Sequence, residues 1–180
     1  MKASTLDTNI IVVEDFFSKE RCAEYIRFSE QKGYEEAKVS VGDEQRMMKG
    51  IRNNSRIMFT DEALARQIWE QIEPFVVKKY GNAQAIGLNE MFRFYKYDPG
   101  QRFKRHRDGN YERNEHEVSF FTLMIYLNED FDGGETKFDS VIVKPKAGTA
   151  LIFEHSLKHE GASIEKGSKY VLRTDIMYKV

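Results

Sequence analysis

Three side chains of this 180-residue chain could bind one metal ion, although they lie in two distant parts of the sequence. His106 is followed two positions later by Asp108. Alternate side chains of an extended strand point to the same face, so this pair could reach one ion. A second histidine, His159, could complete the set from another strand. We therefore interpret His106, Asp108 and His159 as candidate metal ligands.

Two imidazoles and one carboxylate on one side of a metal leave the opposite coordination positions open. This geometry is typical of non-haem iron(II) oxygenases, in which the open positions can bind a keto acid and dioxygen. A structural zinc site is disfavoured, because the sequence offers one cysteine and no evident fourth ligand. Taken alone, His106 and Asp108 could also be a hydrogen-bonded pair on a solvated strand.

The other two histidines are weaker candidates. His116 lies between Glu115 and Glu117 in a polar segment, which predicts a solvent-exposed loop. His155 precedes His159 by four positions, so the two would share a face if the intervening strand were regular. We therefore expect His155 to be a neighbour of the metal site or a rival ligand.

A keto acid such as 2-oxoglutarate would need a cation for the carboxylate that lies away from the metal. If residues 159–175 form a β-hairpin in which His159 lies opposite Arg173, then His159, Lys169 and Arg173 all face the same way. Lys169 would lie about 13 Å along the strand from Arg173, within reach of such a carboxylate. We rank Lys169 first and Arg173 second, because Arg173 could instead pair with Asp175.

The second half of the chain has the pattern of a β-sheet protein. Runs of β-branched and aromatic residues predict strands there over residues 91–97, 102–107, 117–127, 141–143, 149–153 and 169–178. Two shorter runs, over residues 10–13 and 56–59, predict strands in the first half as well. Helices followed by many short strands predict an α+β fold, in which supporting helices pack against an antiparallel double sheet or barrel.

Two helices are predicted in the first half of the chain. One follows an N-cap at Ser18 and reaches Gly33, and the other runs from a cap at residues 60–62 to about Tyr80. We expect a single domain over residues 1–180, with a mainly helical support region over 1–85 and the catalytic core over 86–180.

The composition excludes several classes of partner. The chain has 28 basic and 29 acidic residues, so its net charge of -1 provides no general attraction to nucleic acid or to an anionic membrane. Its single cysteine, Cys22, lies in an apolar helical pattern and is expected to be a buried thiol. The first residues lack the apolar run of a signal peptide. We therefore expect a cytoplasmic protein with no membrane or nucleic-acid partner.

Several short motifs follow one another between about residues 91 and 178. They are YDPGQRF at 97–103, HRD at 106–108, YLN at 126–128, GGETKF at 133–138, VKP at 143–145, GTALIF at 148–153, HEG at 159–161 and GSKY at 167–170. In this order and spacing the sequence resembles the prolyl 4-hydroxylase-like branch of the iron(II)/2-oxoglutarate-dependent dioxygenases. The segment VVEDFFS at 12–18 resembles the support region of the same family.

The resemblance implies a double-stranded β-helix, or jelly roll, as the core. It implies Fe(II) as the metal, bound by His106, Asp108 and His159, and 2-oxoglutarate as co-substrate, with ascorbate as a candidate reductant. It further implies that Lys169 binds the far carboxylate of 2-oxoglutarate and that Tyr126 donates its hydroxyl to the same group. Tyr126 could equally be a core aromatic residue, and both roles are compatible.

The same resemblance implies hydroxylation of an unactivated C–H bond of a prolyl or peptidyl substrate, with decarboxylation of 2-oxoglutarate to succinate. The chain departs from the collagen-type pattern at residues 171–175, which read VLRTD where a tryptophan-containing segment is usual. Oxygenation of a free amino acid or another small molecule is therefore an alternative. A halogenase is disfavoured by Asp108, and a non-catalytic module with a residual metal site is a further alternative.

Overall fold

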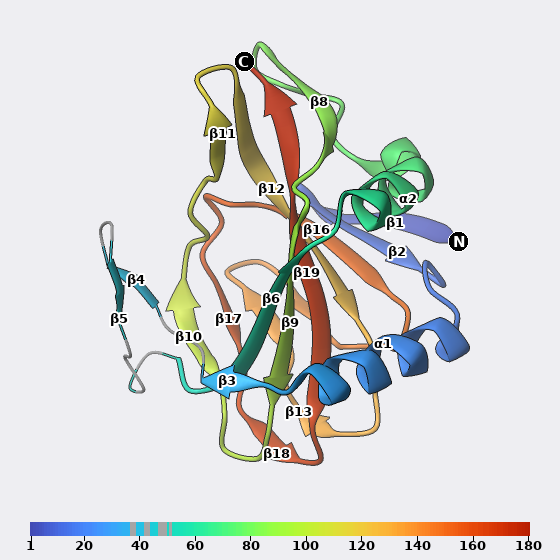
Figure 1. The fold of residues 1–180 in the computed structure, drawn as a ribbon, viewed down its shortest axis with the longest axis vertical. Helices are drawn as coiled ribbons and strands as arrows, with labels where there is room; N and C mark the ends of the chain where they lie inside the picture. The colour runs from blue at the N-terminus through green and yellow to red at the C-terminus, as the bar shows by residue number, and fades with distance from the viewer. Residues whose placement is uncertain (37–38, 42–43, 47–49, 51) are drawn as a thin grey trace.

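The computed structural model describes the chain except for residues 37–38, 42–43, 47–49 and 51 (Figure 1). Its helices are α1 (Lys19–Lys32), α2 (Glu62–Ile72) and the 3-10 helix η1 (Glu73–Phe75). Its strands are β1 (Lys2–Asp7), β2 (Ile10–Glu14), β3 (Glu35–Glu36), β4 (Val39–Val41), β5 (Glu44–Arg46), β6 (Ser55–Thr60), β7 (Lys79–Tyr80), β8 (Ala83–Leu88), β9 (Met91–Tyr97), β10 (Phe103–His106), β11 (Glu112–Asn114), β12 (Glu117–Tyr126), β13 (Asp132–Gly133), β14 (Thr136–Phe138), β15 (Ile142–Val143), β16 (Ala150–Glu154), β17 (His159–Gly161), β18 (Ile164–Lys166) and β19 (Lys169–Lys179).

Two antiparallel sheets form the body of the protein. The large sheet has the strand order β1-β2-β16-β12-β19-β9-β6-β3, and a smaller sheet has the order β10-β17-β14-β15. Tyr95 and Leu151 of the large sheet share one buried cluster with Phe138 and Val143 of the smaller sheet. The two sheets therefore pack face to face, which confirms the predicted α+β fold with a jelly-roll core.

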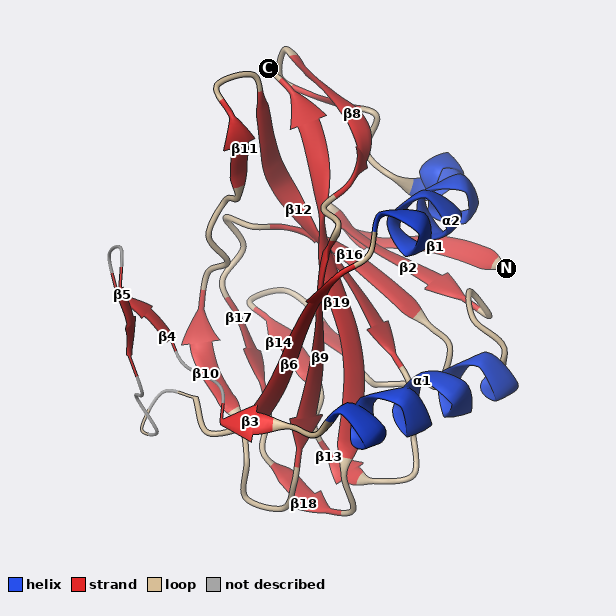
Figure 2. Cartoon of the chain, in the orientation of Figure 1, coloured by secondary structure: helices blue, strands red, loops and turns tan. Residues whose placement is uncertain are grey.

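Alternation along the central strands separates the helical support from the functional side of the large sheet. On β9, Phe92 and Phe94 belong to the cluster that also contains buried residues of α1 and α2. Tyr95 and Tyr97 belong to the cluster between the two sheets. Because neighbouring strand residues point to opposite faces, one face of the sheet packs on the helices and the other faces the smaller sheet. Figure 2 shows both helices on the same side of the strands.

The first helix has the predicted limits. The Ser18 hydroxyl accepts a hydrogen bond from the amide of Arg21 at 3.2 Å, as an N-cap does. At the other end Gly33 has a φ of 81°, a conformation that favours glycine, and its amide donates to the carbonyls of Ser29 and Glu30. The capping residues of α1 were therefore readable from the sequence.

The predicted end of the second helix is wrong. Asp61 caps α2 as expected, by accepting from the amide of Leu64 at 2.9 Å. The α-helix ends at Ile72, and residues 79 and 80 belong to β7 instead. Pro74 follows within η1, and proline has no amide hydrogen and clashes with the preceding turn of an α-helix. The proline therefore explains the early end.

The N-terminal region supplies strands as well as helices. β1, which the sequence analysis did not predict, pairs with β2, and β2 pairs with β16 in the catalytic half. β6 pairs with β9 over its whole length. The support region over residues 1–85 is therefore joined to the core through the large sheet, and not through helix packing alone.

The predicted hairpin between residues 159 and 175 is wrong. β17 pairs with β10 and β14 of the smaller sheet, whereas β19 pairs with β9 and β12 of the large sheet. The segment expected to be the turn forms β18, which pairs with β13. The chain therefore crosses from one sheet to the other between His159 and Lys169, and His159 lies opposite His106 instead of Arg173.

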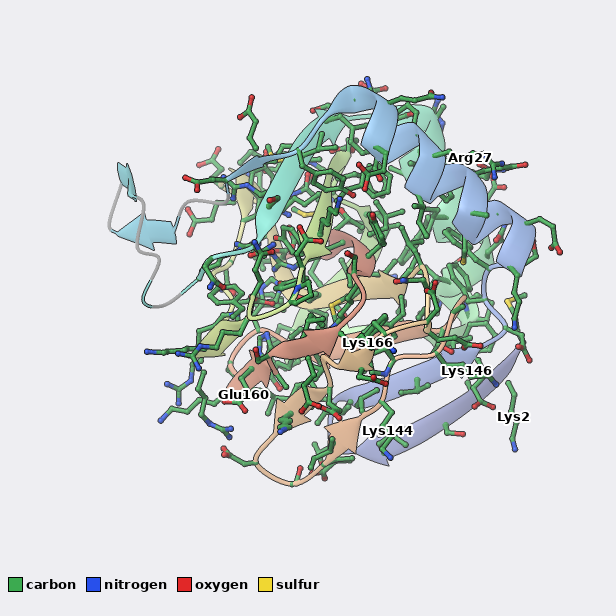
Figure 3. The ribbon with its side chains drawn as sticks, turned by 90° about the horizontal axis from the view of Figure 1, so that it is seen from below. Lys2, Arg27, Lys144, Lys146, Glu160 and Lys166 are labelled. Carbon is green, nitrogen blue, oxygen red and sulfur yellow. The ribbon has the colours of Figure 1, made fainter. Side chains whose placement is uncertain are left out.

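The outer surface is charged and the single thiol is buried. Figure 3 shows Lys2, Arg27, Lys144 and Lys146 projecting from the periphery of the fold, and all four are exposed.

Cys22 is 1% exposed, as predicted, and burial raises the pKa of its thiol to about 11. None of the described helices has the length and apolarity needed to span a bilayer.

Candidate metal and co-substrate site

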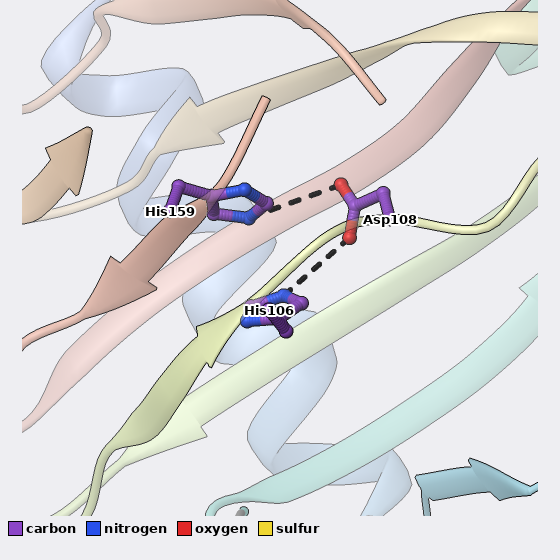
Figure 4. A group of neighbouring side chains, drawn as sticks. All are labelled: His106, Asp108 and His159. Atoms are coloured by element: carbon purple, nitrogen blue, oxygen red, sulfur yellow. Dashed lines mark ion pairs between the residues drawn. The ribbon is translucent and has the colours of Figure 1, made fainter. Parts of the chain in front are cut away.

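The structure brings the three predicted ligands together at the end of the smaller sheet (Figure 4). His106 ends β10 and pairs with His159, the first residue of β17. Asp108 lies just beyond the end of β10, with Oδ1 3.5 Å from Nε2 of His106 and Oδ2 4.0 Å from Nε2 of His159. One ligand atom from each residue lies within 4.8 Å of the others. This separation suits three donors around one ion.

Backbone carbonyls orient both imidazoles for metal binding. Nδ1 of His106 lies 2.7 Å from the carbonyl of Lys104, and Nδ1 of His159 lies 3.1 Å from the carbonyl of Leu157. A carbonyl only accepts hydrogen bonds, so each Nδ1 carries the hydrogen and each Nε2 keeps a free lone pair. The two Nε2 atoms that carry these lone pairs are the ones that lie next to the carboxylate of Asp108.

The ionisation of the site also suits a cation. Burial lowers the pKa of His159 to about 4, so its imidazole is neutral at pH 7. Burial alone would raise the pKa of Asp108, but Arg173 and the two histidines hold it well below its usual range. The donor set is therefore a neutral His159 imidazole and a carboxylate that is ionised at neutral pH, together with His106.

Two side chains fix the carboxylate of Asp108. Thr122 donates its hydroxyl to Oδ2 at 2.6 Å, and Nη2 of Arg173 lies 3.1 Å from the same oxygen. The backbone amide of Asp108 donates to the carbonyl of His155 at 3.1 Å. Oδ2 is thus occupied by protein donors, whereas Oδ1 is directed toward His106. Such outer contacts orient a carboxylate ligand and favour binding through a single oxygen.

Lys169 is a buried cation in the same cavity. Its side chain is 4% exposed and donates to the carbonyl of Gly134 at 2.6 Å. It makes no ion pair with any residue that the structure describes, although Glu135 acts on it from a distance. Burial lowers the pKa of its amine to about 7. An anion bound here would restore the positive charge of the amine and gain a strong hydrogen bond.

Arg173 is already engaged by protein carboxylates. Its Nη2 lies 3.1 Å from both Asp108 Oδ2 and Asp175 Oδ1, and its Nη1 donates to the hydroxyl of Tyr95 at 3.3 Å. The expected pair with Asp175 is therefore present. Asp175 also pairs with Arg93, with Oδ2 3.1 Å from Nη1 of the arginine. Arg93 belongs to β9 and lies directly opposite Arg173. Asp108 also compensates the charge of Arg173 beside the candidate metal site.

One cavity between the sheets is lined by His106, Asp108, His159, Lys169 and Arg173, among other residues. Their convergence was predicted from a hairpin that the chain does not form. It arises instead because odd-numbered residues of β19 face the smaller sheet, which carries the histidines.

Residues 92–174 match the family model described as the 2OG-Fe(II) oxygenase superfamily. The matched segment contains the whole triad together with Lys169 and Arg173. The segment that holds the candidate site therefore has the sequence pattern of this superfamily. The protein is a dioxygenase that uses Fe(II) and 2-oxoglutarate, and the two free imidazole nitrogens and the carboxylate described above fit that metal.

Individual relatives of the oxygenase are prolyl hydroxylases by name. The chain is 24% identical over 182 residues to a prolyl 4-hydroxylase candidate of Acanthamoeba polyphaga mimivirus, covering 89% of this chain and 70% of the relative. The viral collagen prolyl hydroxylase of Paramecium Bursaria Chlorella virus-1, solved with 2OG, superposes with a TM-score of 0.64 at 20% identity, covering 96% of this chain and 97% of that one.

A further solved structure has a higher TM-score. The prolyl hydroxylase of Trichoplax adhaerens, in complex with a hypoxia inducible factor oxygen degradation domain peptide fragment, superposes with a TM-score of 0.71 at 16% identity. The superposition covers 93% of this chain and 83% of that chain. At these identities the structural matches show the shared fold of the oxygenase.

The remaining histidines of the oxygenase lie outside the triad. His116 is exposed, as predicted. His155 is buried, but it lies in a turn after β16 and so does not share a strand face with His159. Its Nδ1 lies 3.1 Å from Asn110 Oδ1 and its Nε2 3.7 Å from Asp175. His155 is thus a neighbour of the site that acts through its carbonyl on Asp108.

Sequence reasoning did not identify several side chains of the site. Thr122 lies on the same face of β12 as Tyr126, four residues earlier, so alternation could have indicated it. Thr136 lines the cavity, and its hydroxyl lies 2.7 Å from that of Tyr126. Tyr95 faces the cavity two residues before Tyr97. Tyr126 itself is fully buried, which agrees with its alternative role as a core aromatic.

Proposed function

We propose that this oxygenase hydroxylates a prolyl residue of a peptide while 2-oxoglutarate is decarboxylated to succinate. The observation that carries the proposal is one cavity in which two free imidazole nitrogens and a fixed carboxylate lie near a buried lysine that has no carboxylate partner among the described residues. The prolyl hydroxylases among its relatives, one of them in complex with a peptide, support a prolyl peptide as substrate.

In this proposal Nε2 of His106, Nε2 of His159 and Oδ1 of Asp108 bind Fe(II). When bound, Fe(II) would supply the activation of dioxygen, with 2-oxoglutarate as reductant; one oxygen atom would enter succinate, carbon dioxide would be released, and the other oxygen atom would enter the substrate as a hydroxyl. The residues of the chain hold the donors in place: two carbonyls orient the imidazoles, and Thr122 and Arg173 orient the carboxylate.

We propose that Lys169 binds the far carboxylate of 2-oxoglutarate. Lys169 has one protein hydrogen bond, whereas Arg173 is engaged by two carboxylates, a tyrosine and a threonine, which supports the ranking of Lys169 above Arg173. The ammonium lies 5.2 Å from the ring centre of Tyr126. The linked hydroxyls of Tyr126 and Thr136 are therefore candidates for a second hydrogen bond to the same carboxylate.

Two alternatives are less well supported by the site. A halogenase would need the carboxylate position open, but Asp108 is present and held by two donors. A non-catalytic binding module would not need both imidazoles oriented or a buried, unpaired lysine.

We also propose a cytoplasmic location, because ferrous iron is kept reduced in the cytoplasm.

Metal binding is tested with two histidine variants. His106→Ala should abolish stoichiometric binding of Fe(II) under anaerobic conditions and succinate formation from 2-oxoglutarate. His116→Ala, which removes an exposed histidine outside the site, should change neither. If the unmodified protein binds no Fe(II) and forms no succinate, the proposed function fails. If the wild type binds Fe(II) but His106→Ala retains its metal, the site has been assigned to the wrong residues.

The substrate and the anchoring cation need separate measurements. Mass spectrometry of prolyl peptides after turnover should show the addition of one oxygen atom at proline, and a screen that finds oxidation only of free amino acids would overturn the peptide proposal. Lys169→Ala should raise the 2-oxoglutarate requirement more than Arg173→Ala does. The opposite order would assign the far carboxylate to Arg173.

A further inference from the structure

Arg52 packs against two aromatic residues of the metal cavity, although it comes from the N-terminal half of the chain. The carbon of its guanidinium is 4.4 Å from the ring centre of Tyr95 and 4.5 Å from that of Phe103, and both rings line the cavity. Phe103 in turn stacks on His106, with ring centres 3.5 Å apart. Only one aromatic ring therefore separates the guanidinium of Arg52 from a candidate metal ligand.

The guanidinium of Arg52 is buried and incompletely satisfied. Arg52 is 5% exposed, and its Nε donates to Asn54 Oδ1 at 2.6 Å. Among the residues that the structure describes, its Nη2 has no hydrogen-bond partner and the arginine makes no ion pair. A buried cation without a carboxylate is costly to keep, so such a group is strongly disposed to accept an anion.

The neighbouring arginines cannot supply that anion site as readily. Arg93 and Arg173 share Asp175, and Arg173 also pairs with Asp108. Asp108 and Asp175 are thus already paired with Arg93 and Arg173.

Tyr95, which lies between these arginines, reports the excess positive charge. Burial alone would raise the pKa of its hydroxyl, but Arg173, Arg52 and Arg93 lower it to about 7. Three arginines thus lie near two carboxylates, Asp108 and Asp175, and the excess positive charge favours a negatively charged group there.

We propose that Arg52 forms a substrate subsite that binds a carboxylate of the molecule being oxidised. This inference rests on the proposed function, since it names the chemistry of the substrate for the same cavity. The carboxylate can come from an acidic side chain next to the target residue in a peptide, or from the terminal carboxylate of a peptide or free amino acid. Both present the same planar anion to a guanidinium.

The geometry separates this subsite from the co-substrate. Lys169 lies opposite Tyr97 in the β9–β19 pairing, and Arg52 stacks on Tyr95, two residues earlier on β9. Two anions can therefore be bound along one wall, with the carboxylate of 2-oxoglutarate at Lys169 and that of the substrate at Arg52. Packing on two aromatic rings does not satisfy the N–H groups of Arg52 Nη2, whereas a substrate carboxylate would accept a hydrogen bond from them.

Binding measurements test the subsite without turnover. Protein loaded with Mn(II) and 2-oxoglutarate, in the absence of oxygen, is titrated with matched peptides that differ only in one group. One pair has Asp or Asn beside proline, and another ends in a proline carboxylate or its amide. The wild-type protein should bind at least one acidic member roughly tenfold or more tightly than its neutral partner, and the pair that shows the difference identifies the source of the carboxylate.

Three variants locate the effect. Arg52→Gln should bring the ratio between acidic and neutral members close to one, and Arg52→Lys should keep part of it. Arg27→Gln, which removes an exposed charge from α1, should leave the ratio unchanged (Figure 3). Thermal unfolding of each variant shows whether it is folded, and the wild-type comparison decides the question even if Arg52→Gln is not.

The outcomes separate this inference from the proposed function. Equal wild-type binding of acidic and neutral members in every pair, or an acidic preference that survives in folded Arg52→Gln, would overturn the carboxylate subsite. Hydroxylation of prolyl peptides irrespective of their charge would then leave the proposed function standing. Conversely, an Arg52-dependent acidic preference without oxidation of any proline would support the subsite and refute the prolyl reaction.

Discussion

Replacing Lys169 with methionine should make the metal-free protein more stable while abolishing its use of 2-oxoglutarate. Burial lowers the pKa of Lys169 from 10.5 to about 7, so the unfolded chain binds this proton more tightly than the folded chain does. At pH 7 this difference disfavours the folded wild type by about 4 kcal/mol. Loss of the hydrogen bond to the Gly134 carbonyl should remove about 1 kcal/mol. Lys169→Met should therefore be about 3 kcal/mol more stable at pH 7.

The sign of the pH dependence follows from the same pKa. Between about pH 7 and pH 10.5 the unfolded Lys169 binds more protons than the folded one, so wild-type stability rises with pH over this window. The advantage of Lys169→Met should shrink across the window and vanish near its upper end. Other titrating groups are common to both proteins, so their contributions largely cancel in the difference.

Urea unfolding of both proteins at several pH values across this window measures the difference directly. Lys166→Met, which removes an exposed lysine from β18, is the control and should show no such pH-dependent gain (Figure 3). Calorimetric titration should show that 2-oxoglutarate binds to the wild type but not to Lys169→Met. In urea unfolding, added 2-oxoglutarate should therefore stabilise only the wild type. A Lys169→Met protein that is less stable than wild type at pH 7, by an amount independent of pH, would refute the reasoning.

Three further predictions concern other parts of the molecule. In the metal-free protein Tyr95 should ionise near pH 7, and an ultraviolet titration should show this ionisation in the wild type but not in Tyr95→Phe. The stability of the wild type relative to this variant should rise between about pH 7 and pH 10. Identical titrations of the two proteins would contradict the prediction. Gly148→Ala should destabilise the fold by about 2 kcal/mol or more in urea unfolding, because Gly148 has a φ of 78° and a Cβ would lie 2.1 Å from the Phe17 carbonyl oxygen. Gly100→Ala, with similar φ but open space, should cost clearly less. Cys22 should react with a thiol reagent only after unfolding, and rapid labelling of the native protein would show that its burial is incomplete.

Local rules were sufficient where the functional residues lie close together in sequence. The two-residue spacing of His106 and Asp108 placed both side chains toward one centre, although β10 ends at His106 and Asp108 lies beyond it. Alternation along β19 likewise placed Lys169 and Arg173 on one face. Capping residues predicted both ends of α1, because a cap is decided by a few adjacent side chains.

Pairing between distant strands could not be obtained in this way. The sequence of the three-residue strand β18 resembles a turn, and a turn there predicts that β17 pairs with β19. In the structure the partners of β17 are β10 and β14. Register depends on which strands are neighbours in space, and periodicity alone does not contain that information. The position of Arg52 over Tyr95 and Phe103 has the same origin, because it joins parts of the chain about 45 residues apart.

Asp175 makes three positions of the chain interdependent. Arg93 and Arg173 lie directly opposite each other on neighbouring strands, and one carboxylate at position 175 bridges both guanidinium groups. Exchanging Asp175 alone for an apolar residue would leave two partly buried guanidinium groups facing each other, with Asp108 still paired to Arg173. During divergence these positions should therefore change as a set. Oxygenases with an apolar residue at the position of Asp175 are expected to have exchanged the arginines as well, so this trio can sort members of the superfamily into groups.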